Sequence, residues 1–183
     1  MTARWLGALL TLLLVGMVGC GNDGGEDDVD TADATARLES QRDDVRETAR
    51  SLLVAAEKAL PGVTTNSGGS YRGCESAFNN EFKNFRYLAQ ARIDVDAASG
   101  ASAPYVESLR PVLEEIGFTA EDLEELPNGF VTLSGAKDEV RASFTHTGAG
   151  AFVGLTVAGP CVDVPEDDRD DWLTRDEPTP EIR

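Results

Sequence analysis

The sequence has few basic residues and few of the side chains that bind transition metals. Its 183 residues include 16 Lys and Arg against 33 Asp and Glu, which gives a formal net charge of -17. Such a chain lacks the clustered cations that bind a phosphate backbone or an anionic lipid surface, so we expect no nucleic-acid partner. A single His and 3 Cys exclude most sites that need several His or Cys ligands. We therefore predict neither a metal nor a cofactor.

Long apolar runs are also absent, except for one near the N-terminus. Residues 5–18 form an uncharged stretch of 14 residues after Arg4, shorter than the roughly 20 residues that span a bilayer. Their length and position predict a signal peptide at residues 1–19. The stretch runs into Met17-Val18-Gly19-Cys20. Ordinary secretory cleavage favours small residues at both key positions, and only Gly19 meets that requirement.

The Val-Gly-Cys ending resembles the lipobox of bacterial lipoproteins, with Met17 in the place of the usual Leu. In that class the cysteine after the lipobox is S-diacylglycerated, and a dedicated signal peptidase cleaves before it. The resemblance implies that Cys20 carries a lipid that holds the protein on the membrane. A soluble secreted protein and an uncleaved anchor are the alternatives.

Two cysteines remain in the exported part, Cys74 and Cys161. An even pair in an oxidising compartment predicts a disulfide. It would close a loop of 87 residues, and the chain-entropy model gives such a loop up to about 4.5 kcal/mol of stability. A metal site built from these two cysteines and His146 is the alternative, but it lacks an obvious fourth ligand.

Composition divides the mature chain into three parts. Residues 20–35 are rich in Gly and Asp and have no apolar periodicity, which predicts an acidic flexible tether. Residues 36–162 carry the periodic segments and predict a single α+β domain. Residues 163–183 hold nine acidic residues, three basic residues and three Pro, which predicts a disordered acidic tail.

Within the domain, helical and extended periodicities alternate. We predict a helix at 36–60, a loop at 62–73, a strand at 85–95, a helix at 102–118 that Pro111 breaks near Arg110, a short helix from 119, and strands at 130–134, 139–147 and 151–159. The disulfide would bring the last strand beside the first, in antiparallel pairing. The expected fold is an antiparallel sheet of about four strands, stapled by the disulfide, with helices packed on one face.

Candidate chemistry is sparse. His146, the single histidine, falls on the inward face of the strand at 139–147, beside a Gly-rich turn. A hydrogen-bonded residue at the edge of the core is the favoured interpretation, and a catalytic base is the alternative. No nucleophile-elbow or phosphate-binding glycine motif is present. Arg86 and Arg92, on the outer face of the first strand, could contact an anion, but a separation of roughly 20 Å prevents them from sharing a small one.

The lipobox, the acidic tether and one Cys pair that brackets a strand, a helical stretch and a closing hairpin resemble small lipoproteins of actinobacterial envelopes. This resemblance implies an extracytoplasmic protein anchored by lipid to the outer face of the cell membrane. It supplies no catalytic residues. We expect a non-enzymatic module that binds another envelope component, such as a protein, or a small apolar ligand. The alternative is an envelope hydrolase that uses His146 with a carboxylate.

Overall fold

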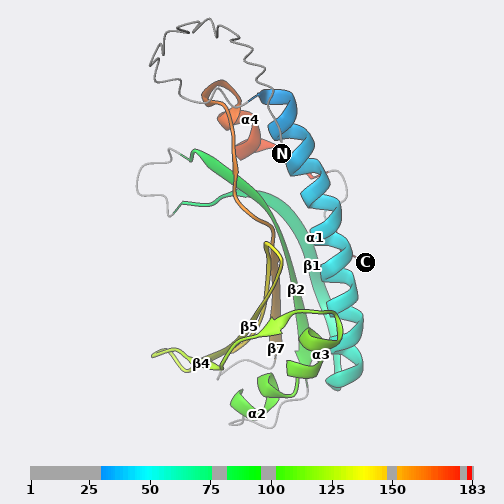
Figure 1. The fold of residues 1–183 in the computed structure, drawn as a ribbon. Coiled ribbons are helices and arrows are strands. Elements are labelled where there is room, and N and C mark those ends of the chain that lie inside the picture. Colours follow the sequence, from blue (N-terminus) through cyan, green and yellow to red (C-terminus); the bar gives the residue numbers. More distant parts are fainter. Residues whose placement is uncertain (1–29, 76–81, 96–101, 148–151, 178–180, 183) are drawn as a thin grey trace, which may run out of the picture.

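The computed structural model describes residues 30–75, 82–95, 102–147, 152–177 and 181–182. A long helix lies along an antiparallel sheet, and shorter helices lie near the two ends of the sheet (Figure 1). In chain order the elements are α1 (Thr31–Ala59), β1 (Gly62–Gly73), β2 (Asn84–Val95), α2 (Ser102–Glu107), α3 (Arg110–Glu115), β3 (Thr119–Ala120), β4 (Glu124–Glu125), β5 (Phe130–Lys137), β6 (Val140–Thr147), β7 (Phe152–Ala158), β8 (Val162–Asp163), the 3-10 turn η1 (Glu166–Asp168) and α4 (Arg169–Thr174). The predicted signal peptide and Cys20 lie outside the described residues.

The strands form one sheet in the order β1-β2-β7-β6-β5-β3, with β4 paired to β5 and β8 paired to β2. All of these pairs are antiparallel. The prediction of about four strands is therefore wrong, because the described part of the chain contributes eight. The expected pairing of the last long strand with the first is confirmed: β2 pairs with β7 from Leu88↔Ala158 to Asp94↔Phe152.

The largest of the added strands is β1, which the sequence predicted to be a loop. Its Gly-, Ser- and Thr-rich residues pair with β2 from Gly62↔Val95 to Gly73↔Phe85. The edge of β2 supplies the backbone partners, and these outweigh the weak strand preference of β1 itself. Gly69 has a packing role here, because a Cβ at this position would overlap the Tyr87 hydroxyl. The glycines of β1 therefore permit close approach within a strand rather than making a flexible loop.

The long helix α1 begins earlier than predicted. Asp30 caps it, and its Oδ1 accepts a hydrogen bond of 2.7 Å from the Ala32 amide. The tether prediction is therefore wrong for residues 31–35, which are helical because this cap satisfies the first turn. The expected apolar stripe of the helix is confirmed. Its buried members include Leu38, Val45, Ala49, Leu52 and Ala56, and they pack on β2 and β7.

A buried amide fixes α1 against the sheet. The side chain of Gln41 is only 7% exposed. Its Nε2 donates to the Pro160 carbonyl at 2.7 Å, and its Oε1 accepts from the Tyr87 amide at 2.5 Å. Because β7 has ended before the position opposite Tyr87, the glutamine supplies this amide with its partner. Both ends of the buried side chain are thus satisfied, as burial of an amide requires.

The second helical region is broken as predicted. Two short helices, α2 and α3, replace the single pattern, and Pro111 lies in the first turn of α3. Gly117 follows the end of α3 with φ +94°, the left-handed conformation expected after a helix. The prediction of another helix from residue 119 is wrong. Residues 119–120 and 124–125 instead form β3 and β4, which pair with the free edge of β5.

The acidic C-terminal segment is not a disordered tail in its described part, so that prediction is wrong. Val164, Trp172 and Ile182 are at most 4% exposed. The Trp172 ring contacts that of Tyr71 edge-on, with centroids 4.7 Å apart, and Arg50 Nε donates to the Ile182 carbonyl at 3.0 Å. Three apolar side chains set among acidic residues are enough to dock the segment on α1 and β1.

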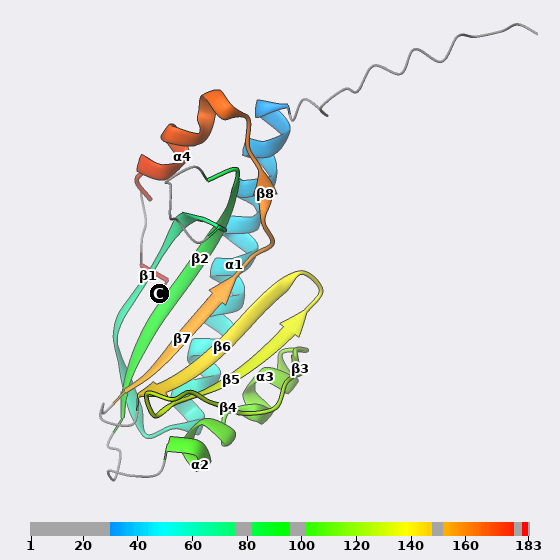
Figure 2. The same ribbon diagram turned by 90° about the vertical axis from the view of Figure 1, so that its left-hand side faces the viewer.

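The sheet has two different faces. One face lies under α1, while the other, which is turned to the viewer in Figure 2, has no described helix across it. The alternating burial of β2 shows the same division, with Phe85, Tyr87 and Ala89 buried and the residues between them partly exposed. In the described part of the chain, no helix is both long enough and apolar enough to cross a membrane.

Candidate functional site

The predicted disulfide between Cys74 and Cys161 is present, and their Cα atoms are 6.1 Å apart. It joins the end of β1 to the connection between β7 and β8, so it ties together segments that flank β2 on both sides. The two thiolates that the alternative metal site required are therefore bonded to each other. Among the described residues, no group of three or more His, Cys, Asp or Glu side chains is placed to hold a metal ion.

His146 lies where the sequence predicted, on the inward face of β6 at the edge of the core, with 4% of its surface exposed. Its Nδ1 is 3.0 Å from Ser102 Oγ at the start of α2. Its Nε2 is buried and has no hydrogen-bond partner in the described part of the chain. Burial lowers the pKa of the imidazole below its usual value, because the surroundings solvate the cation poorly.

This environment does not favour a general base. A catalytic imidazole needs access to substrate and a partner that stabilises the imidazolium once it accepts a proton. No described carboxylate hydrogen-bonds to either ring nitrogen of His146. The hydrogen bond to Ser102 instead joins α2 to the sheet, and so gives the histidine a structural role at the α2–β6 contact.

The uncovered side of the sheet, called here the open face, carries mainly short polar side chains. It consists of the outward residues of β1, β2, β7, β6 and β5, which register places in rows across the strands. One such row is Gly68, Gln90, Thr156, Ser143 and Ser134. Hydroxyls and amides side by side provide both hydrogen-bond donors and acceptors over several strands.

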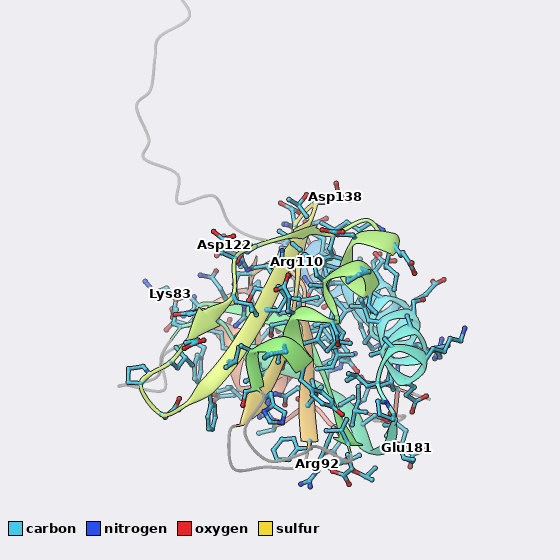
Figure 3. The ribbon with its side chains drawn as sticks, turned by 90° about the horizontal axis from the view of Figure 1, so that it is seen from below. Lys83, Arg92, Arg110, Asp122, Asp138 and Glu181 are labelled. Atoms are coloured by element: carbon cyan, nitrogen blue, oxygen red, sulfur yellow. A yellow bond between two sulfur atoms is a disulfide. The ribbon has the colours of Figure 1, made fainter. Side chains whose placement is uncertain are left out.

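A hollow of about 500 Å³ lies on the open face over β1 and β2. Its polar lining includes the side chains of Asn66, Ser70 and Gln90 between Arg72 and Arg92, and no described carboxylate lines it. Arg92 also bonds Asp94 at 2.6 Å and lies over the Phe152 ring. This bond lowers the pKa of the Asp94 carboxyl. Figure 3 shows Arg92 projecting outward, on the opposite side of the view from Asp138.

Arg86, which the sequence singled out with Arg92, has a cationic neighbour in the structure. Register places Arg72 of β1 directly opposite Arg86 of β2 on the open face. Most arginines on the rest of the surface pair with acids, such as Arg110 with Glu107 and Arg141 with Glu121. Within the described residues, neither Arg72 nor Arg86 forms an ion pair, and Arg86 Nε is buried without a hydrogen-bond partner.

A larger groove of about 670 Å³ lies between α1 and the β5–β6 hairpin. Its apolar floor includes Val45, Phe118 and Val162, which are at most 3% exposed. Its rim carries charges of both signs, among them Arg37 and Asp44. The groove therefore presents both apolar and charged surface, and its lining exposes a larger apolar share than that of the hollow on the open face.

The sequence pattern did not reveal the open face of β1. Outward and inward residues alternate from Asn66 to Arg72, but both sets contain Gly or Ser, so no hydrophobic period is visible. The signal that could have found the strand was Tyr71 followed by Arg72, one inward apolar and one outward charged side chain next to a cysteine. Register across β2 then places Arg72 beside Arg86, which no local pattern can show.

Comparison of the chain with protein-family models, with curated proteins and with solved structures gives no match in any of the three. The site therefore has to be interpreted from its own residues.

Proposed function

We propose that this chain is a lipid-anchored protein of the cell envelope whose folded domain binds a hydrophilic envelope component with its open face. The observation that carries the proposal is the sheet face that no described helix covers, together with its polar hollow over β1 and β2. Sheets with one packed and one solvated face are common. The hollow, however, is lined by two arginines and two amides. It brings together more hydrogen-bonding groups than a sheet face that contacts only water requires.

Anchoring and location are inferred from the N-terminal sequence. Cys20 follows a short apolar stretch, and the disulfide is compatible with an oxidising compartment outside the cytoplasm. Asp30, the cap of α1, lies ten positions after Cys20 in the sequence. A chain of that length spans at most roughly 35 Å. A lipid on Cys20 would thus keep the domain within reach of membrane-proximal envelope material.

The anchoring part is tested with Cys20→Ser. We expect the variant to leave the membrane fraction or to accumulate as uncleaved precursor, because the acceptor of the lipid is gone. Fractionation followed by intact-mass measurement distinguishes the two. A cleaved Cys20→Ser product that stays membrane-bound to the wild-type extent would refute lipid anchoring.

The binding part is tested by hydroxyl-radical labelling of the full-length protein, with and without an isolated wall and membrane fraction. We expect protection of Leu88 and Phe152, which lie on the open face and are partly exposed. Val54 on α1 and Leu173 on α4, which are 47% and 42% exposed, are the matched controls. Protection of the controls alone, or of no site, would contradict binding through the open face.

A further inference from the structure

A pair of arginines without a described counter-charge lies at one end of the open face. Arg72 and Arg86 are directly opposite each other across β1 and β2. Like charges in such a pair repel and destabilise a sheet. Acids outnumber bases two to one in this chain, yet no described acid forms an ion pair with either arginine. Two adjacent guanidinium groups without a counter-charge are suited to hold an anion.

Two acidic residues lie near this arginine pair, but one is hydrogen-bonded to other groups and the other lies farther along the strand. Glu75 accepts hydrogen bonds from the Lys83 amide and from Asn84 Nδ2, each at 3.3 Å. Asp163 lies opposite Asn84 in the pairing of β8 with β2, one outward position beyond Arg86. Neither belongs to the lining of the hollow. The lining of the hollow thus carries Arg72 and Arg92 and no described carboxylate, although Arg92 also pairs with Asp94 beside the hollow.

The rest of the hollow extends the same surface along the strands. Its lining begins at Arg72, opposite Arg86, and continues past Ser70 and the amides of Gln90 and Asn66 to Arg92. Arg92 lies six positions after Arg86, which corresponds to roughly 20 Å of strand. This distance is too long for one small anion, but it fits an extended chain that carries an anionic group near each end and hydroxyls between them.

We propose that this stripe along β1 and β2 binds an anionic polysaccharide of the envelope. The inference rests on the proposed function and names its ligand class. Arg72 and Arg86 hold one anionic group, Arg92 contacts another, and Ser70, Gln90 and Asn66 exchange hydrogen bonds with sugar hydroxyls. These side chains donate and accept in comparable numbers, as hydroxyls do.

An acidic peptide fits the stripe less well. Extended peptides bind sheets chiefly by pairing their backbone with a free strand edge. In the stripe, the backbone of β2 is already paired with β1 on one side and with β7 on the other, so among the described strands only the outer edge of β1, at the side of the stripe, is left for such pairing. The floor between the arginines contains Gly68 and offers Leu88 as its only large apolar side chain among the described lining residues, so pockets for peptide side chains are lacking.

The test compares binding of three polymers to the mature, lipidated protein in detergent micelles. Carboxymethyl-dextran and unmodified dextran share a backbone and differ in carboxylates, and polyglutamate represents an acidic peptide. We expect saturable binding of carboxymethyl-dextran that weakens with salt, and weaker binding of the other two. Isothermal titration calorimetry measures all three.

Arg72→Gln/Arg92→Gln is the matching variant. It should weaken carboxymethyl-dextran binding by about tenfold or more, because charge-assisted hydrogen bonds are lost at both ends of the stripe. Arg37→Gln/Lys58→Gln changes the net charge equally on exposed residues of α1 and should bind like the wild type. Thermal unfolding checks that both variants remain folded.

Equal binding of dextran or polyglutamate, or equal weakening by the α1 variant, would overturn the inference. So would the absence of polysaccharide binding. In that last case, persistent protection of Leu88 and Phe152 by envelope material would leave the proposed function intact, whereas loss of both signals would refute both proposals.

Discussion

Two buried polar side chains, Gln41 and His146, show how individual residues fix this fold. Both lie at contacts between a helix and the sheet, and each is at most 7% exposed. Gln41 is satisfied at both ends, whereas His146 has one bonded and one unpartnered nitrogen. A satisfied buried amide selects one register of helix against sheet. A half-satisfied imidazole makes the stability of its contact depend on pH.

Replacing Gln41 should have a large effect for a single side chain. Gln41→Leu keeps the volume but leaves the Tyr87 amide and the Pro160 carbonyl without this partner. Each unsatisfied buried group costs about 1–3 kcal/mol, so we expect the free energy of unfolding in urea to fall by roughly that amount or more. Ser40→Ala, one position earlier and exposed, should change it by less than about 0.5 kcal/mol. Equal stability of the two variants would show that the amide does not secure the contact.

His146 should make the protein less stable at mildly acidic pH. Its pKa is lowered in the folded state, so between that pKa and the ordinary value of about 6.5 the unfolded chain binds more protons. The stabilisation is complete above pH 6.5 and is lost as the pH falls below it. We expect the free energy of unfolding to decrease from pH 7 to 5, and to decrease less in His146→Asn.

The pH range separates this histidine from the carboxylates. The pKa values of Asp94 and Glu107 are lowered by hydrogen bonds from Arg92 and Arg110. Their contributions are therefore lost only when the pH falls below about 4, the ordinary range of carboxyl groups. Urea titrations at pH 7, 6 and 5 give the comparison. Parallel pH profiles for His146→Asn and the wild type would contradict the assignment.

Among the elements, the C-terminal segment differs most from the structure that its composition predicted. Arg175 lies over the Trp172 ring at 4.3 Å and forms an ion pair of 2.8 Å with Glu39 of α1. Arg46 of the same helix donates to the Glu181 carbonyl at 2.5 Å. Cationic side chains of α1 thus meet the acidic segment, while its few apolar residues bury themselves against β1 and α1.

Trp172→Ala tests this docking. Truncation of a buried tryptophan costs about 3–5 kcal/mol when its cavity remains, and we expect a loss near the lower end because the segment can partly undock. Leu173→Ala is the matched control, since Leu173 is 42% exposed and should cost less than about 0.5 kcal/mol. Chemical denaturation measures both. If Trp172→Ala proved as stable as the control, the segment would contribute nothing to the domain.

At the scale of the whole molecule, one covalent bond joins distant parts of the sheet. The disulfide closes a loop of 87 residues, from the end of β1 to the connection after β7. Within that loop lie β2, the two short helices and the strands β3 to β7. The link therefore holds both neighbours of β2 in place, and with them the strand that carries Arg86, Gln90 and Arg92 of the proposed binding stripe.

Removing the link should destabilise the whole domain. For Cys74→Ser/Cys161→Ser we expect the free energy of unfolding to fall by up to about 4.5 kcal/mol, from the entropy of the opened loop. Reductant should lower the stability of the wild type by a comparable amount and leave the variant unchanged. An intact mass with two free thiols in exported protein would instead show that the bond does not form.

The local sequence was sufficient to predict features that a short run of residues determines. Three such features were predicted: the apolar stripe of α1, the break before Pro111 and the alternation of β2. Helical hydrogen bonds and side-chain periodicity involve residues only a few positions apart. The inward position of His146 followed from the same alternation. The disulfide followed from counting cysteines in a chain expected to be exported.

The elements that were missed, β1, β3, β4 and the docked C-terminal segment, depend on partners remote in the chain. A strand satisfies its backbone only through another strand, so Gly- and Ser-rich residues beside the edge of β2 become β1 although their composition is that of a loop. The sequence by itself thus determined the helix, one strand face and the covalent link. Only the tertiary structure decided which face stays open and that Arg72 meets Arg86 there, because cross-strand register is set by pairing between segments that no local pattern connects.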